Sequence, residues 1–416
     1  RVIDRSVETM RLQDNEGSGG ISNKADNQSE KTHYMPPSNI GLVQTESSTQ
    51  ILSSAHSDYI HHVSFDIYGR RMATCSGDCF VRIWNLHHSI PKNPSNPSTS
   101  ASDESSQQQW IISSQFQAHR GPVTHVCWSH AEFGTLVATC GIDGEVKIWE
   151  ETTTLTTSSG GSGTTNSLSP VTSQQAGQAS HSSVGNSSNS HGVLWITRAN
   201  LTEARKPVTC VAFAPRHVGL QLATASADGT CRIYEAVDLQ NLSQWPLQGS
   251  FTAFSGGISS CLSWSTGRFE PPTLVVGGST HLAIWRYSTS TRQWAPLPIQ
   301  FPKHSGPVLD VAWAPNVGRR FHWIASTEQG GPLRVYQLDR ISSSSSDDCN
   351  LVLKSTQELP SQDAWKCQWN VTGTVLAASG DAGVVQLWKS NPQGEWKCVS
   401  QIHTCEQLDI SSRIED

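Results

Sequence analysis

Short runs of alternating apolar and polar residues, separated by turn residues, recur along most of the chain. One run ends in an aromatic residue, and another ends in an aromatic nineteen to twenty-three residues later. This pair of runs occurs six times. The opening aromatics are Phe65, Trp128, Phe213, Trp264, Trp313 and Trp369, and the closing ones are Trp84, Trp149, Tyr234, Trp285, Tyr336 and Trp388. Such a period predicts a repeat architecture in which each repeat is one supersecondary unit.

The first repeat indicates how each unit folds. Residues 60–65 alternate as a strand, 66–69 form a turn, 71–75 a second strand, 76–78 a tight turn and 79–84 a third strand. A fourth strand is expected after each closing aromatic, and residues 110–112, 193–196, 351–353 and 396–399 fit it. Four short antiparallel strands per repeat, repeated radially, predict an all-β, six-bladed β-propeller.

Four stretches dominated by Ser, Thr, Gly, Asn, Gln and Pro interrupt the repeats, at 1–48, 91–109, 151–192 and 341–349. Because these stretches lack the apolar residues that offset chain entropy, they are expected to be disordered or loop. The predicted organisation is a disordered tail at 1–48, a propeller at 49–405 with a disordered insert at 151–192, and a C-terminal tail at 406–416. The inserts are expected between third and fourth strands.

Charge and cysteine content narrow the function classes. The chain has 29 basic and 35 acidic residues, a net charge of −6, which argues against direct binding to nucleic acid. Its longest apolar runs have the length of strands, so no membrane span is expected. The eleven cysteines form no Cys-x-x-Cys pair and lie mostly in strand-like runs, which favours small buried thiols over disulfides or metal ligands.

A polar signature recurs at matching positions of the first two repeats. The two sets are His56, Thr74, Asp78 and Trp84, and His119, Thr139, Asp143 and Trp149. An imidazole, a hydroxyl, a carboxylate and an indole N–H can form a closed chain of hydrogen bonds. Since the set recurs and its hydroxyl belongs to Thr, we interpret it as a network that staples a blade. We expect no catalytic, cofactor-binding or metal site, and no enzyme activity.

The remaining repeats depart from this signature. The third keeps Thr224, Asp228 and Tyr234 but has no His at the leading position; Ser279 and Gly330 replace the Asp in the fourth and fifth; in the sixth, Asp381 is shifted by one and Ala382 stands at the site. Blades four to six are therefore expected to be less well stapled. Trp245 and Trp294 fit none of the repeated aromatic positions and are candidates for an exposed contact surface.

The His, Thr, Asp and Trp pattern is accompanied by several longer distinctive runs, at 63–66, 69–76, 132–134, 213–220, 233–236, 241–245, 314–319, 321–322 and 369–377. The pattern resembles the WD-repeat family, and the runs resemble the Seh-type nucleoporins of the nuclear-pore outer ring. The resemblance covers residues from about 50 to about 405, which includes all six repeats. The low-complexity residues 1–48 and 151–192 are not part of the family pattern.

This resemblance implies an open six-bladed propeller that a helical scaffold nucleoporin completes in trans with a seventh blade. It implies a place at the nuclear envelope, in the Y-shaped complex of the nuclear pore, in support of nucleocytoplasmic transport and pore assembly. It also implies a second home in GATOR/SEA-type complexes at the lysosomal or vacuolar surface, which regulate TOR signalling.

The residues give an independent indication of an open edge. The sixth repeat already has its own fourth strand at 396–399, yet a short apolar piece, Gln50, Ile51 and Leu52, precedes the first repeat. A spare strand beside an unclosed gap would be an exposed sheet edge, which a partner can pair with. The same piece could instead be the lead-in to the first strand.

Two other functions compete with the open scaffold. A closed propeller could act as a substrate receptor for a ubiquitin ligase, but the Trp-Asp-x-Arg ending expected of such receptors is absent from all six closing pieces. A vesicle-coat scaffold propeller would also be open and six-bladed, and the nucleoporin-like runs weigh against it.

Overall fold

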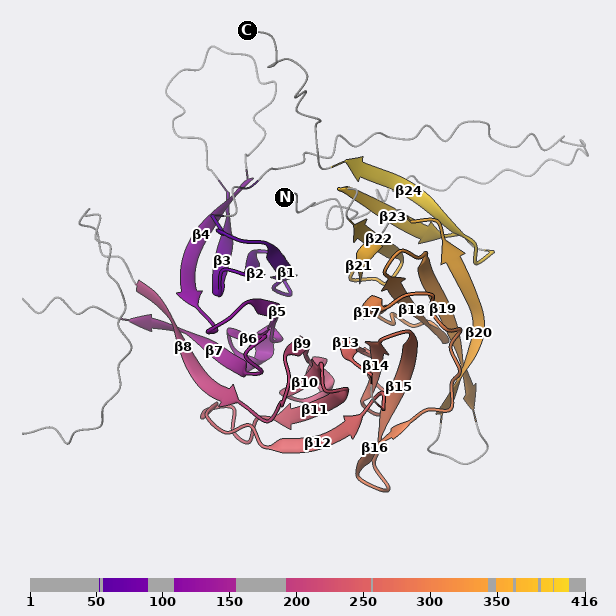
Figure 1. Cartoon of the computed structure of the whole chain (residues 1–416), viewed down its shortest axis with the longest axis horizontal. Helices are drawn as coiled ribbons and strands as arrows, with labels where there is room; N and C mark the ends of the chain where they lie inside the picture. Colours follow the sequence, from indigo (N-terminus) through magenta and orange to yellow (C-terminus); the bar gives the residue numbers. More distant parts are fainter. Residues whose placement is uncertain are drawn as a thin grey trace, which may run out of the picture. The chain divides into compact units, whose positions relative to one another are not determined.

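Turn residues at regular intervals break this chain into short strands that pair with their neighbours in sequence. The computed structural model describes residues 52, 55–88, 108–154, 192–255, 257–342, 349–361, 364–380, 383–391 and 393–403. In these residues, six four-stranded antiparallel sheets each consist of four consecutive strands (Figure 1). The prediction of an all-β, six-bladed propeller is confirmed.

We number the blades one to six along the chain. The strands are β1 Ile60–Phe65, β2 Arg71–Ser76, β3 Phe80–His88 and β4 Gln108–Gln117 in blade one; β5 Val123–Trp128, β6 Leu136–Gly141, β7 Val146–Thr154 and β8 Gly192–Leu201 in blade two; β9 Val208–Phe213, β10 Gln221–Ser226, β11 Thr230–Glu235 and β12 Leu247–Thr252 in blade three; β13 Ser259–Trp264, β14 Thr273–Gly278, β15 His281–Ser288 and β16 Gln293–Pro296 in blade four; β17 Val308–Trp313, β18 Phe321–Glu328, β19 Leu333–Ser342 and β20 Cys349–Leu359 in blade five; and β21 Ala364–Trp369, β22 Val375–Gly380, β23 Val384–Ser390 and β24 Trp396–His403 in blade six. Two short 3₁₀ helices, η1 Ala131–Phe133 and η2 Arg216–Val218, lie between the first two strands of blades two and three.

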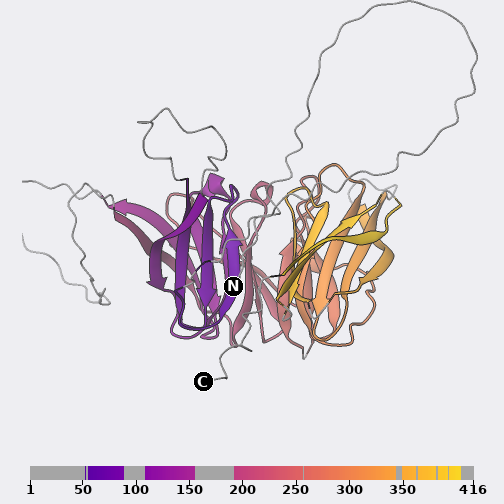
Figure 2. The same ribbon diagram turned by 90° about the horizontal axis from the view of Figure 1, so that it is seen from above.

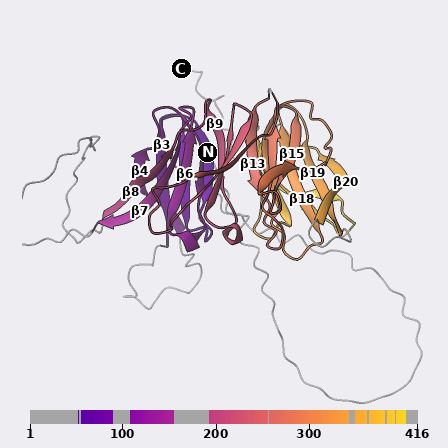
Figure 3. The same ribbon diagram turned by 90° about the horizontal axis from the view of Figure 1, so that it is seen from below.

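The chain forms two compact units. The N-terminal unit is His56–Ser259, and the C-terminal unit is Ser260–Asp416 together with Arg1–Ala55. Blades one to three lie in the N-terminal unit, and the C-terminal unit holds blades five and six with nearly all of blade four. Within each unit the strands lie side by side, and the turns that connect them lie at the two opposite ends of the sheets (Figures 2 and 3).

Apolar side chains pack between successive blades of each unit. One cluster joins blades one and two through Ala73, Val81, Val126 and Trp149, and another joins blades two and three. In the C-terminal unit, corresponding clusters lie between blades four and five and between blades five and six. Because every strand contributes side chains to both faces of its sheet, burial depends on having a neighbouring blade on each side.

The low-complexity stretches fall where they were expected along the sequence, between third and fourth strands, but their predicted bounds need correction. Residues 108–109 belong to β4, 151–154 to β7, 192 to β8, 341–342 to β19 and 349 to β20. The rest of these stretches lies outside the described residues, as do 1–48 and 406–416. The third and fourth strands of these blades are longer than expected, because they continue to pair beyond the apolar core. In blade one, for example, His88 of β3 pairs with Gln108 of β4.

A fourth strand was expected in every blade, but the sequence located only four of the six. β12 and β16 were not located, because neither reads as an apolar run. Nine cysteines of the described residues carry free thiols, and six of these are buried. No described helix is long and apolar enough to cross a membrane.

Candidate functional site

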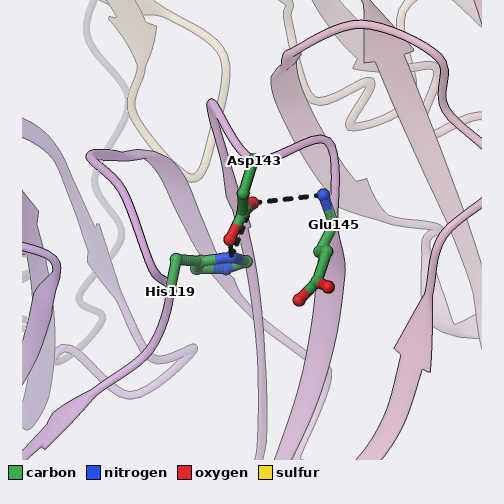
Figure 4. Close-up of side chains that lie close together, drawn as sticks. All are labelled: His119, Asp143 and Glu145. Carbon is green, nitrogen blue, oxygen red and sulfur yellow. Dashed lines mark hydrogen bonds and ion pairs between the residues drawn. The ribbon is translucent and has the colours of Figure 1, made fainter.

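The four predicted polar residues of blade two come together at one end of its sheet. The indole N–H of Trp149 donates to Oγ1 of Thr139 (3.0 Å), and the same oxygen lies 2.9 Å from Nε2 of His119. Nδ1 of His119 lies 3.0 and 3.1 Å from the two carboxylate oxygens of Asp143. Figure 4 shows Asp143 between the imidazole of His119 and the backbone nitrogen of Glu145.

The hydrogen atoms of this chain can be placed in one order. Burial lowers the pKa of His119 despite the neighbouring Asp143, so the imidazole is neutral. Its Nδ1–H then donates to Asp143, and its Nε2 accepts the Thr139 hydroxyl, which in turn accepts the Trp149 indole. The Thr139 hydroxyl is fully buried, and it forms hydrogen bonds with both His119 and Trp149. The set therefore works as a structural staple, and its hydroxyl is not accessible to a substrate.

Blade one repeats this geometry and adds a cation. His56 Nε2 lies 2.9 Å from Thr74 Oγ1, which accepts the Trp84 indole N–H (3.1 Å), and His56 Nδ1 lies 2.8 Å from Asp78. The guanidinium of Arg82 contacts Asp78 at 3.1 Å. Burial alone would raise the pKa of Asp78, but hydrogen bonds from His56, the Phe80 backbone and Arg82 lower it to about 2.

Sequence reasoning missed this cation, although a signal was present. A basic residue follows the turn Asp by four positions in blades one, two and three, as Arg82, Lys147 and Arg232. Arg232 pairs with Asp228 at 2.8 Å, and the ammonium of Lys147 donates to the Ala118 carbonyl (2.9 Å). A repeated turn carboxylate followed by a cation on the next strand is thus part of the signature.

In blade three the closing aromatic is used differently. The Tyr234 hydroxyl donates to Glu203 at 2.9 Å, and Thr224 donates weakly to the Arg232 carbonyl at 3.5 Å. The hydroxyl of Tyr extends farther from the backbone than the indole N–H of Trp. Tyr234 therefore donates to Glu203 and not to the hydroxyl of Thr224.

Blade five keeps part of the staple, but Nδ1 of His304 has no hydrogen-bond partner among the described residues. Nε2 of the buried His304 lies 2.9 Å from Ser326 Oγ and 3.1 Å from the Tyr336 hydroxyl. The carboxylate comes from Glu328, which accepts the Ser305 backbone N–H (2.8 Å) and pairs with Arg334 (3.3 Å). Glu328 thus accepts the backbone N–H that follows the His, as Asp78 and Asp143 do, but it makes no bond to the imidazole. In blade six, Asp381 and Ala382 lie outside the described residues.

One group of possible metal ligands occurs among the described residues. Ligand atoms of His119, Asp143 and Glu145 lie within 4.8 Å of one another. All three already have partners: Asp143 binds His119 and the Glu145 N–H (3.1 Å), and Glu145 pairs with Lys147 (3.3 Å). The group is part of the blade-two staple.

The predicted partner edge is only partly visible. Gln50 and Ile51 lie outside the described residues, and Leu52 is half-buried and belongs to no strand. The prediction of an exposed Trp245 is wrong, because this side chain is 5% exposed and its indole N–H donates to the Leu242 carbonyl (2.9 Å). Trp294 is half-buried on β16, with ring contacts to Trp264 and Tyr287.

Three opening aromatics of the N-terminal unit are not fully buried. Phe65, Trp128 and Phe213 line a shallow pocket of about 230 Å³ in the N-terminal unit, together with Ile67, Ser129, His130, Ala214, Pro215 and Arg216. Phe65 is 37% exposed, whereas Trp264, Trp313 and Trp369 of the C-terminal unit are buried.

Comparison with known proteins adds a family to this geometry. The model of the WD domain, G-beta repeat, matches residues 47–85, 110–150 and 197–235, which contain the staples of blades one to three. The chain is 36% identical over 359 residues to Nucleoporin SEH1 of Danio rerio, covering 83% of this chain and 85% of the relative. It is 35% identical over 360 residues to Nucleoporin SEH1-A of Xenopus laevis, covering 84% and 86%. It is 34% identical over 361 residues to Nucleoporin SEH1 of Homo sapiens, covering 83% and 86%.

Proposed function

Because the chain belongs to the SEH1 family of WD-repeat nucleoporins, we propose that it is a non-catalytic scaffold subunit of the nuclear pore complex whose propeller is completed in trans by a partner. The partner is a helical scaffold nucleoporin that inserts a seventh blade next to blade six. The chain then supports pore assembly and nucleocytoplasmic transport by holding that partner.

One observation carries this proposal: each blade is built from four consecutive strands in the described residues. Blade six takes its fourth strand, β24, from its own repeat, and blade one takes all four strands from residues 60–117. Within the part of the chain that the structure describes, no strand from either end pairs with the blade at the other end. In a closed propeller, a strand from one end of the chain often completes the blade at the other end. Here, a blade supplied by a partner would take the place of that exchange.

The burial of the second strands supports the same conclusion. In blades one to five these strands are buried at every position apart from the first residue in some of them. In blade six, β22 is buried only at alternate positions, and Val375, Ala377 and Ser379 between them are half-buried. Alternate residues of a strand share one face, so one face of this sheet lacks the cover that its counterparts have.

The neighbouring strand β21 of the same blade extends this uncovered face. Gln368 of β21 pairs directly with Ala377 and is exposed, and Trp365 on the same strand is 37% exposed. A similar difference is found within the N-terminal unit, where Ile60 and Val63 of β1 are half-buried, whereas the matching Val123 and Val126 of β5 are fully buried. Covering such apolar area stabilises a complex by about 25 cal/mol per Å².

Co-purification tests the proposal. The chain is expressed alone and with each candidate helical nucleoporin, and the complexes are compared by size-exclusion chromatography with light scattering. We expect Ala377→Glu on the uncovered face to abolish complex formation, and Lys397→Glu on the exposed outer strand β24 to preserve it. A monodisperse chain that binds none of these nucleoporins, or full binding by the Ala377→Glu variant, would refute the proposal.

A second role, in GATOR/SEA-type complexes and TOR signalling at the lysosomal or vacuolar surface, would use the same face of blade six. In that role only the partner differs. The Ala377→Glu variant is therefore expected to lose both sets of partners, as measured by mass spectrometry of the complexes purified from cells.

A further inference from the structure

Three loops of the C-terminal unit place large apolar side chains in solvent. They connect the first and second strands of blades four, five and six, at residues 265–272, 314–320 and 370–374. Phe269 is 91% exposed, Val317 68% and Val371 83%. Single exposed apolar residues are ordinary on protein surfaces, but an almost fully exposed Phe with two companions on successive loops calls for an explanation.

Hydrogen bonds join the three loops into one surface, which we call the loop ledge. The Asn316 N–H donates to Oγ1 of Thr266 (3.0 Å), which ties the blade-five loop to the blade-four loop. The guanidinium of Arg319 donates to the carbonyls of Pro315 (2.5 Å) and Gly373 (2.7 Å), which ties it to the blade-six loop. The three apolar side chains are therefore held by connected backbone.

A buried carboxylate fixes the loop that carries Phe269. Glu270, the next residue, is 9% exposed and its carboxylate lies 3.0 Å from Nε2 of His322 and 3.3 Å from Arg340. Both partners belong to blade five. A loop anchored this way keeps Phe269 in place, so binding through Phe269 would cost little conformational entropy.

The exposed charges of the ledge are all positive. Arg268 and Arg320 are exposed, and Arg319 is half-buried. Glu270 is the only acidic residue in the three loops, and it is buried and paired. The ledge thus combines exposed apolar groups with guanidinium groups that no exposed carboxylate of these loops neutralises.

We propose that the loop ledge is a docking surface for a protein segment in which apolar side chains are flanked by aspartate or glutamate. The Arg groups would pair with the carboxylates and the apolar side chains would cover Phe269, Val317 and Val371. An anionic membrane is a poorer occupant, because the chain's net charge of −6 opposes its approach to a negative surface. The ledge shares no residue with the uncovered face of blade six, so this partner is additional to the inserted blade.

Photo-crosslinking in the intact complex tests this proposal. Phe269 and Val371 are replaced one at a time by p-benzoylphenylalanine in the full chain, and the complex is purified through a tag on this chain before irradiation. Val352, which is 45% exposed on the outer strand β20, is the matched control. We expect adducts from 269 and 371, and none from 352, with the same peptide of a stoichiometric subunit, and mass spectrometry should find Asp or Glu beside its apolar residues.

Charge reversal gives the second measurement. In Arg268→Glu/Arg320→Glu, the affinity for the crosslinked subunit should fall at least tenfold, while Val352→Ser should leave it unchanged. The proposal is overturned by an absence of protein adducts at 269 and 371, by adducts with lipid only, by an adduct peptide rich in Lys or Arg, or by unchanged affinity after charge reversal. Because the inserted blade is measured separately with Ala377→Glu, failure of the ledge leaves that result standing.

Discussion

Removing the central hydroxyl of the blade-two staple should destabilise the protein although it increases apolar burial. In Thr139→Val, a methyl group replaces the hydroxyl that accepts the Trp149 indole N–H and binds His119 Nε2. Both partners are buried, at 7% and 2% exposure. Each orphaned polar group costs about 1–3 kcal/mol, and the added methyl returns about 0.8 kcal/mol. The expected loss in the free energy of unfolding is therefore about 3 kcal/mol.

Thr139→Ser is the matched comparison, because it keeps the hydroxyl and removes only a methyl group. Its expected cost is about 1 kcal/mol. The order of stability should thus be Thr, then Ser, then Val, which is the reverse of what apolar burial alone predicts for Ser and Val. Urea denaturation of the full chain gives the ranking. Amide hydrogen exchange of β6 and β7 then shows whether the loss begins in blade two.

A Val variant as stable as the Ser variant would refute the hydrogen-bond order assigned here. It would mean that Trp149 and His119 find other partners at little cost. Unchanged exchange in β6 and β7 would likewise contradict a local staple.

Three further predictions follow from particular residues. Burial lowers the pKa of His56, His119 and His304 below the ordinary 6.5, so the unfolded chain binds more protons than the folded chain just below pH 6.5. The urea midpoint of unfolding should therefore fall as the pH is lowered from about 7 to about 5. In His304→Gln, the urea midpoint should change less steeply with pH. Burial raises the pKa of the Cys140 and Cys367 thiols far above 9.0, so a timed iodoacetamide reaction read by mass spectrometry should label the exposed Cys398 first and these two only on unfolding. Gly373 has φ 63° and an added Cβ would lie 2.4 Å from the Pro315 carbonyl oxygen, so Gly373→Ala should lower the thermal midpoint more than Gly394→Ala, where φ is 86° and the Cβ meets open space.

The sequence was sufficient to predict the blades because two local signals agree. Short runs of strand-forming residues mark the first three strands of each repeat, and turn residues mark their ends, as at Ile60–Phe65 and Arg71–Ser76. The staples of blades one and two were predictable because Thr, Asp and Trp stand at the same offsets in both, after a leading His. All members of such a staple belong to one repeat or its lead-in, so it can be predicted without knowing how the neighbouring blade packs.

The partial staple of blade five was missed because its carboxylate stands at another position along the chain. Ser326 and Tyr336 keep the ten-residue spacing of Thr74 and Trp84, so this pair was a usable signal. The carboxylate, however, moved to Glu328, and a template that required a turn Asp excluded it. Trp245 was misplaced for another reason: its burial depends on the fold of residues 236–246, which carry no period of their own.

Burial at blade six could not be predicted, because it depends on the position of the blade and not on its residues. β22 reads Val-Leu-Ala-Ala-Ser-Gly, which is as small and apolar as β6, Leu-Val-Ala-Thr-Cys-Gly, and β10, Gln-Leu-Ala-Thr-Ala-Ser. β6 is buried at all six positions and β10 at five, whereas β22 is buried at two. A strand whose composition suits a covered position but whose alternate residues are half-exposed is what a sheet would present before a further blade packs against it. Mismatch between composition and exposure, rather than exposed apolar area alone, is therefore the reason why we propose blade six as the position of the inserted blade.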